Sequence, residues 1–257
     1  GKTNRAMEKK IVAAVLVIAT FLLAQESWPL IGWERAPEGW GYILVQTLNR
    51  AFWYLLLPCL VLAWMYRPRD PMRELGLSGG FVRGMGMALV CTLPMLLGYA
   101  WLSGLTFHFE VEGFLLSCVL AALAEEVLYR GFFFGQLHRR VGLPFIVAAG
   151  AGALFFGLGH LYQGHTLADT TGIFLVTLAG ALWFSWLYKA WDYNLWVPIG
   201  LHFLMNFYWM LFEIGDNALG GAGANVFRVL TIVVSVVWTL RRQRQARRQA
   251  AGAVAVE

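Results

Sequence analysis

The sequence predicts an all-α protein, a polytopic bundle of transmembrane helices, and three observations support this prediction. Of its 257 residues, 59% are hydrophobic and only 14% are charged, whereas a soluble domain usually has about 25% charged residues. The apolar residues fall in runs of about 20, the length that an α-helix needs to cross the hydrocarbon layer. Most of the twelve tryptophans lie near the ends of these runs, as expected for rings that favour the headgroup layer. Backbone groups inside a bilayer must bond within their own segment, so the runs form helices.

Eight apolar runs predict about eight spans in a single integral-membrane domain, 1–257. In chain order they are 8–28, 42–66, 82–106, 113–137, 142–163, 171–190, 195–214 and 224–240. The apolar core of the first run, Ile11–Ala24, follows Lys9 and Lys10, and the run lacks a convincing cleavage site of small residues, so we expect a retained anchor. Residues 67–80 contain prolines and then an amphipathic turn, which suits an interfacial segment. The glycine-rich residues 220–223 predict a loop, and the basic residues after 240 a stop-transfer anchor.

The positive charges predict the orientation. Most lysines and arginines fall on the side of the two chain ends, whereas the opposite side has few, among them Arg50 and Arg228. The positive-inside rule then places both termini in the cytoplasm. Because the basic residues cluster beside spans, the net charge of +5 is attributed to topology, and we expect no nucleic-acid partner. The composition suits a bacterial inner membrane.

Few ionisable residues lie within the predicted spans, and these are the candidate functional residues. With one polar companion they are Glu125, Glu126, Arg130, His160, His202, Asn206 and Glu213. Such residues usually face a bundle interior or a wet cavity and indicate function. The alternative for each is a hydrogen bond that only joins two helices.

Helical geometry separates the two glutamates. At about 100° per residue, Glu126 and Arg130 lie about 40° apart, and a glutamate four residues before an arginine is the favoured order for an ion pair. Glu125 is turned about 140° from Arg130, so it needs another partner. A carboxylate in a water-poor site is a candidate general base or acid. We therefore expect Glu126 and Arg130 to support the structure and Glu125 to do the chemistry.

The two histidines lie on other helices. His160 follows Gly157 and Gly159, which allow close approach to a neighbouring helix, but it falls nearer the outer boundary than the glutamates. His202 and Asn206 lie one turn apart on one face of the seventh run. A histidine with an asparagine one turn later, plus a second histidine and an unpaired glutamate, favours a site over isolated core residues.

These residues form three motifs that occur in a fixed order in one family. The motifs read Glu125-Glu126-Val-Leu-Tyr-Arg130, Phe156-Gly-Leu-Gly-His160 and His202-Phe-Leu-Met-Asn206, and an Arg-Glu-Leu-Gly-Leu stretch begins at Arg73. Over residues 70–210 the chain resembles the CPBP intramembrane endopeptidases, which include CAAX-prenyl proteases and bacteriocin-processing relatives. The resemblance implies a glutamate-dependent protease with no metal, in which Glu125 and His160 activate a water. His202 and Asn206 would then stabilise the oxyanion.

Three alternatives remain open from the sequence. Glu125, His160 and His202 could provide three ligands of a catalytic zinc ion, although no His-Glu-x-x-His motif is present. Buried glutamate and histidine could pass protons in a transporter, although no repeated half is evident. The polar cluster could also serve only assembly. The substrate is expected to be a membrane-associated protein or peptide, with a C-terminal sorting signal, a leader peptide or a CAAX-type tail as candidates.

Overall fold

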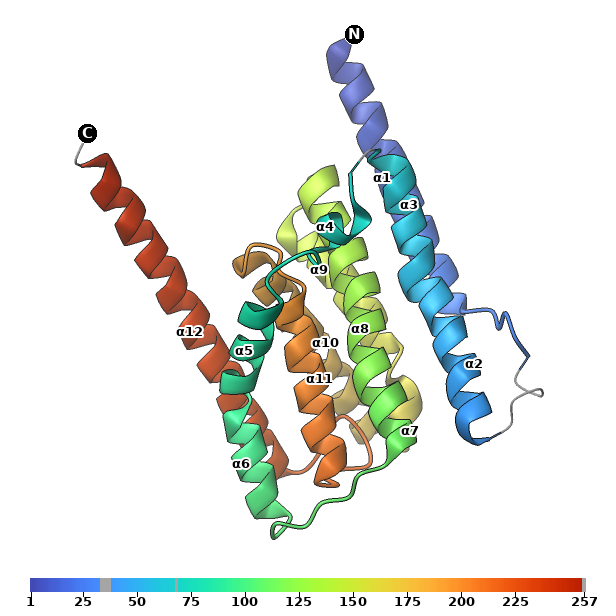
Figure 1. Ribbon diagram of the computed structural model, residues 1–257, viewed down its shortest axis with the longest axis vertical. Helices are drawn as coiled ribbons and strands as arrows, with labels where there is room; N and C mark the ends of the chain where they lie inside the picture. Colours follow the sequence, from blue (N-terminus) through green and yellow to red (C-terminus); the bar gives the residue numbers. More distant parts are fainter. Residues whose placement is uncertain (33–37, 68, 256–257) are drawn as a thin grey trace.

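The computed structural model describes residues 1–32, 38–67 and 69–255, and in these residues the chain is helical with no β-strand (Figure 1). This confirms the all-α fold. The elements are α1 (Lys2–Glu26), α2 (Gly39–Ala51), η2 (Phe52–Leu56), α3 (Leu57–Met65), α4 (Pro71–Leu75), α5 (Phe81–Cys91), α6 (Leu93–Leu102), α7 (Val111–Gly113), η3 (Phe114–Leu120), α8 (Ala121–Glu126), η4 (Val127–Phe134), η5 (Gln136–Val141), α9 (Phe145–Leu158), η6 (Leu161–Gln163), α10 (Leu167–Ala190), α11 (Trp196–Leu211) and α12 (Ala222–Val254).

Each predicted run coincides with a helix or a series of joined helices. The runs differ in whether these helices are long and apolar enough to span a membrane. Among the described residues, four helical segments are long and apolar enough, namely Gly39–Met65, Phe145–Gln163, Leu167–Ala190 and Ala222–Val254, and the bent pair α5–α6 makes a fifth. Helix α11 has 16 residues, fewer than the roughly 20 of a full span. The series from α7 to η5 contains the two glutamates and the arginine of the first motif.

The third predicted run is broken rather than straight. Helices α5 and α6 meet at an angle of 41°. Pro94 lies in the first turn of α6 and has no N–H to continue the hydrogen-bond ladder of α5. At the bend, the Thr92 hydroxyl donates to the Ala88 carbonyl at 2.7 Å, which satisfies this buried hydroxyl inside the apolar run.

The helix that carries the first motif is irregular. Residues 111–141 run through α7, η3, α8, η4 and η5, and three of these segments are π-helical. Short π-helical turns are rare and occur often at functional sites. Helix α8 ends at Glu126, and η4 begins at the next residue. The two glutamates therefore lie directly before a change in helical pitch.

Two apolar clusters position this helix against α11. One includes Val127 and Leu128 of η4 with Ile199 of α11. The other joins α5, α6, α10 and α12 to α11 through residues such as Met87 and Leu201. Helix α11 thus lies between the two clusters, and its position relative to α8 is fixed by apolar packing on both sides.

The interfacial segment is secured by Glu74. This buried carboxylate of α4 accepts hydrogen bonds from Nη2 and Nε of Arg140 at 2.7 and 3.0 Å and one from Gln136 at 3.4 Å. Burial alone would raise the pKa of Glu74, but the hydrogen bonds and the charge of Arg140 outweigh it and lower the pKa. The contacts connect α4 to η5.

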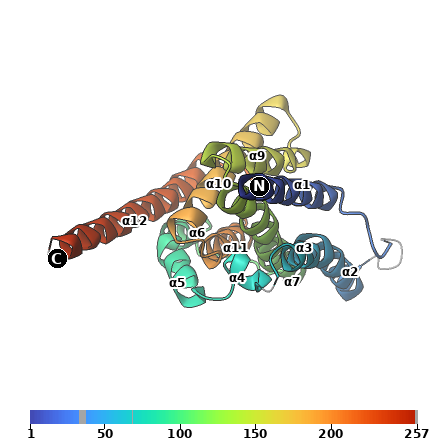
Figure 2. The ribbon, with the colours of Figure 1, turned by 90° about the horizontal axis from the view of Figure 1, so that it is seen from above.

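The carboxyl-terminal helix extends beyond the predicted run. Helix α12 continues through the basic residues to Val254, whereas the apolar pattern predicts an end at 240. Arginine, glutamine and alanine are strong helix formers, so the helix needs no apolar face to continue. Both chain termini lie at the same end of the molecule (Figure 1), and α12 projects from the bundle when it is seen from above (Figure 2).

Candidate active site

The candidate site begins where α11 crosses the end of α8. His202 Nδ1 lies 2.7 Å from Glu126 Oε1, and His202 Nε2 lies 3.6 Å from Glu125 Oε2. One imidazole therefore lies between two successive carboxylates. The first distance is that of a charge-assisted hydrogen bond, whereas the second is too long for a direct one.

Glu126 and Arg130 form the ion pair that their spacing predicts. Arg130 Nε lies 3.2 Å from Glu126 Oε2, and both side chains are almost completely buried. The guanidinium also lies over the rings of Phe156 and Phe184, at 4.7 and 5.4 Å from their centroids. Aromatic faces attract a desolvated cation, so these rings, together with Glu126, stabilise Arg130 inside the bundle.

Glu125 is the more accessible of the two carboxylates, and its partner comes from the second predicted span. Its side chain is 17% exposed, and Arg50 Nη1 lies 3.5 Å from its Oε1 atom. Arg50 also lies over the Tyr54 ring at 4.7 Å. The sequence reading assigned Arg50 to the outer surface and missed this contact. The available signal was that Arg50 lies within the run 42–66 and is therefore an ionisable residue inside a predicted span.

Glu126 also has a contact that the helix angles alone did not predict. The angles give Glu126 a partner in Arg130 and leave Glu125 in need of one, yet the shorter contact of His202 is with Glu126. The two glutamates are about 100° apart around α8, and the imidazole lies within reach of both. Glu126 therefore forms an ion pair with Arg130 and a hydrogen bond with His202.

Asn206 lies one turn after His202 on α11, as predicted. Its Nδ2 atom donates to the Ser117 carbonyl of η3 at 3.0 Å. A side-chain amide has two N–H donors, so the second remains for another acceptor. The bond holds Asn206 against the same irregular helix that carries the glutamates.

His160 lies just beyond the end of α9 and is half-buried. Its Nδ1 atom donates to the Phe156 carbonyl at 2.7 Å, and its ring lies 4.5 Å from the Phe156 ring. No hydrogen bond or ion pair joins it to Glu125 or His202 in the described part of the chain. Gly157 packs α9 closely against Phe174 of α10. His160 therefore borders the cluster through Phe156, which also lies over Arg130.

The remaining candidates lie outside the cluster. Glu213 is exposed after the end of α11. Across residues 1–32, 38–67 and 69–255, no group of three or more His, Cys, Asp or Glu side chains is arranged to hold a metal ion. The donor set that the zinc alternative requires is therefore not gathered in the described residues.

An all-helical fold with several helices long and apolar enough to cross a membrane is that of an integral membrane protein. A family model described as type II CAAX prenyl endopeptidase Rce1-like matches residues 107–208. Residues 107–208 are therefore similar to this family, which confirms the resemblance to the CPBP proteases. All three motifs lie within the matched residues. No curated protein and no solved structure matches the sequence.

Proposed function

We propose that the protein is an intramembrane endopeptidase of the glutamic type, which hydrolyses a peptide bond of a membrane-associated protein or peptide. One observation carries this proposal. Two successive carboxylates flank a single imidazole; Glu126 is completely buried and bonded on both sides, while Glu125 keeps 17% of its side chain exposed. The completely buried Glu126 orients His202, and the accessible Glu125 lies beside this histidine. This is an arrangement suited to Glu125 as a positioned general base.

In this proposal Glu125 takes a proton from a water molecule as the water oxygen attacks the scissile carbonyl. The tetrahedral intermediate then collapses, the C–N bond breaks, and Glu125 returns the proton to the leaving amine. The charges balance because water supplies both the hydroxyl of the new carboxyl group and the proton of the new amine. Proton transfer to a positioned side chain contributes about 10²–10⁴-fold to such a rate.

His160 is proposed to assist in activating the water. A carbonyl oxygen only accepts hydrogen bonds, so the contact with the Phe156 carbonyl places a proton on Nδ1 of His160. In the neutral ring this leaves Nε2 unprotonated. That nitrogen is then a free acceptor for a proton of the attacking water.

His202 and Asn206 are proposed to stabilise the oxyanion. Nδ1 of His202 is engaged by Glu126, so donation to the oxyanion uses Nε2 in the doubly protonated ring. Asn206 has a second amide N–H after its bond to the Ser117 carbonyl. One donor in such a position contributes about 3–4 kcal/mol to transition-state stabilisation.

The membrane setting and the substrate are part of the same proposal. We place eight spans in a bacterial inner membrane, with both termini in the cytoplasm, since the termini share one end of the molecule (Figure 1) and most basic residues lie on their side. The substrate is a lipid-embedded protein or peptide, cut at a C-terminal sorting signal, a leader peptide or a CAAX-type tail. No metal or other cofactor is required.

The test compares the C-termini of membrane proteins in cells that express the wild type or Glu125→Gln, by mass spectrometry. We expect a set of processed C-termini to disappear with Glu125→Gln and to persist with Glu8→Gln, a control at an exposed glutamate of α1. Activity of metal-free protein in the presence of a chelator would support the glutamic type over zinc. Unchanged C-termini, together with a proton flux in liposomes that Glu125→Gln abolishes, would support a transporter instead.

A further inference from the structure

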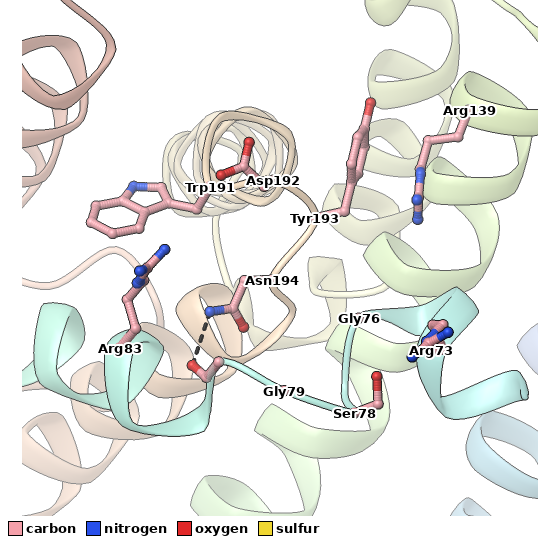
Figure 3. Close-up of a pocket in the computed structure, with 11 residues that line it drawn as sticks. Arg73, Gly76, Ser78, Gly79, Arg83, Arg139, Trp191, Asp192, Tyr193 and Asn194 are labelled. Carbon is pink, nitrogen blue, oxygen red and sulfur yellow. Dashed lines mark hydrogen bonds between the residues drawn. The ribbon is translucent and has the colours of Figure 1, made fainter. Parts of the chain in front are cut away.

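A second polar feature lies away from the glutamates, in an open pocket of ≈ 460 Å³. The pocket is formed by the linker between α4 and α5, by η5 and by the loop between α10 and α11 (Figure 3). The linker between α4 and α5 and the loop between α10 and α11 lie toward the end of the bundle where both chain termini lie (Figure 1). None of the three motifs contributes a residue to the pocket.

Three arginines surround this pocket, namely Arg73, Arg83 and Arg139. Figure 3 shows Arg83 beside Trp191, Arg139 beside Tyr193, and Arg73 beside Ser78. Within the described residues, no carboxylate forms an ion pair with any of these arginines. The acidic residue that lines the pocket, Asp192, is instead paired with Arg242 at 2.8 Å. The pocket therefore has an excess of positive charge.

The backbone around the pocket is held in place by bonds between its segments. Asn194 Nδ2 donates to the Gly80 carbonyl at 2.9 Å, and the Leu195 N–H donates to the Gly76 carbonyl at 3.0 Å. Gly76 has a φ of +85°, and a Cβ there would lie 1.9 Å from the Tyr193 carbonyl oxygen. The linker between α4 and α5 thus lies directly against the loop between α10 and α11. The bonds between them hold the backbone around the arginines in place.

One side of the pocket borders an apolar surface. Phe81 and Val82, the first residues of α5, are 54% and 82% exposed, and they directly precede Arg83. Helix α5 begins a bent pair that is apolar enough to enter a membrane, so we expect this surface at the level where the lipid headgroups meet the acyl chains. Basic pockets between transmembrane helices at this level suit anionic headgroups.

We propose that this pocket binds the phosphate of an anionic phospholipid, with Arg83 contacting the phosphate, Arg73 and Arg139 supplying positive charge from the opposite side of the pocket, and the acyl chains lying over Phe81 and Val82. Guanidinium groups match phosphate oxygens with paired hydrogen bonds. A free phosphate has the same headgroup chemistry but gains nothing from the apolar surface. The site is independent of Glu125 and therefore does not depend on the proposed protease function.

The test measures lipid binding to the full-length protein in detergent by native mass spectrometry, with phosphatidylglycerol, phosphatidylcholine and inorganic phosphate as separate probes. We expect preferential binding of phosphatidylglycerol, weakened about tenfold to a hundredfold by Arg83→Gln. Arg247→Gln removes the same charge from the exposed tail and should leave binding unchanged. Arg83 has no protein partner among the described residues, so its substitution should not affect folding.

Three results would overturn the proposal. Phosphatidylcholine has a phosphate but no net charge, so its equal binding would show that the net negative charge of the lipid is not recognised. Inorganic phosphate that binds as tightly as the lipid would indicate a site for a soluble anion. Equal weakening by Arg83→Gln and Arg247→Gln would indicate attraction by overall charge. Because neither variant touches the glutamate cluster, these results do not depend on whether the protein cleaves peptides.

Discussion

Glu126 accepts a hydrogen bond of 2.7 Å from His202, and this contact joins the irregular helix of the first motif to α11. The same carboxylate pairs with Arg130. It therefore compensates a buried cation and orients an imidazole at once. Glu125, one residue earlier, contacts Arg50 and remains partly accessible.

Replacing Glu126 by glutamine should reduce stability more than replacing Glu125. Glu126→Gln leaves the Arg130 cation without its anionic partner, and breaking a buried pair in this way costs about 3–5 kcal/mol. Unfolding in detergent, followed by circular dichroism, measures the difference. Activity should fall as well, since His202 loses its charged acceptor. Glu125→Gln should stay close to wild-type stability, and equal stability of both variants would contradict the assignment.

Arg50 is expected to act as a positioning residue for Glu125. Its side chain is 37% exposed, so Arg50→Ala should change the unfolding free energy by only about 0–1 kcal/mol. Loss of the contact lets the Glu125 carboxylate move, and a displacement of 1 Å can lower a rate about a hundredfold. Cleavage of a substrate identified from the C-termini would be measured for Arg50→Ala, with Arg50→Lys as the charge-preserving variant.

Partial rescue by lysine would support an electrostatic role of Arg50. A merely structural role would instead lower stability and activity together. Wild-type turnover with Arg50→Ala would contradict the prediction, and Arg5→Ala, an exposed arginine of α1, controls for the loss of one positive charge.

These contacts mark how far the sequence alone could predict the fold and the site. The helices were predictable because each apolar run must satisfy its own backbone bonds, and the Glu126–Arg130 pair was predictable because it depends on the spacing within one helix. The contacts of Arg50 and His202 depend on how α2, α8 and α11 pack against one another. Spacing along one helix contains no information on that packing.

His160 is expected to affect activity more than stability. The side chain is half-buried, and the carbonyl of Phe156, four residues earlier, accepts a hydrogen bond from its Nδ1 atom. His160→Ala therefore removes one hydrogen bond, worth about 0.5–1.5 kcal/mol. If Nε2 accepts a proton from the attacking water, turnover should fall about 10²–10⁴-fold. Glutamine at this position can donate to the Phe156 carbonyl but is a poor base, so His160→Gln should restore stability without restoring turnover. Turnover near that of the wild type in either variant would remove His160 from the mechanism.

The interfacial carboxylate predicts a pH dependence of stability. Interactions with Arg140 hold the pKa of Glu74 below its ordinary value of 4.5, so the folded state favours the ionised form. The resulting stabilisation is fully present above pH 4.5, the ordinary pKa, and is lost as the pH falls through the lower pKa of the folded state. When unfolding by denaturant is measured between about pH 7 and pH 3, the unfolding free energy of the wild type should therefore lose a contribution that Glu74→Gln lacks.

At neutral pH, Glu74→Gln should already be less stable by about 1.5–3 kcal/mol, because Arg140 loses its charged acceptor. The stability difference between the two proteins should then shrink as the pH falls, since protonation of Glu74 in the wild type removes the same interaction. Glu8→Gln, at an exposed site, should follow the wild-type curve. A difference between wild type and Glu74→Gln that stays constant over this pH range would show that the carboxylate charge does not hold α4 against η5.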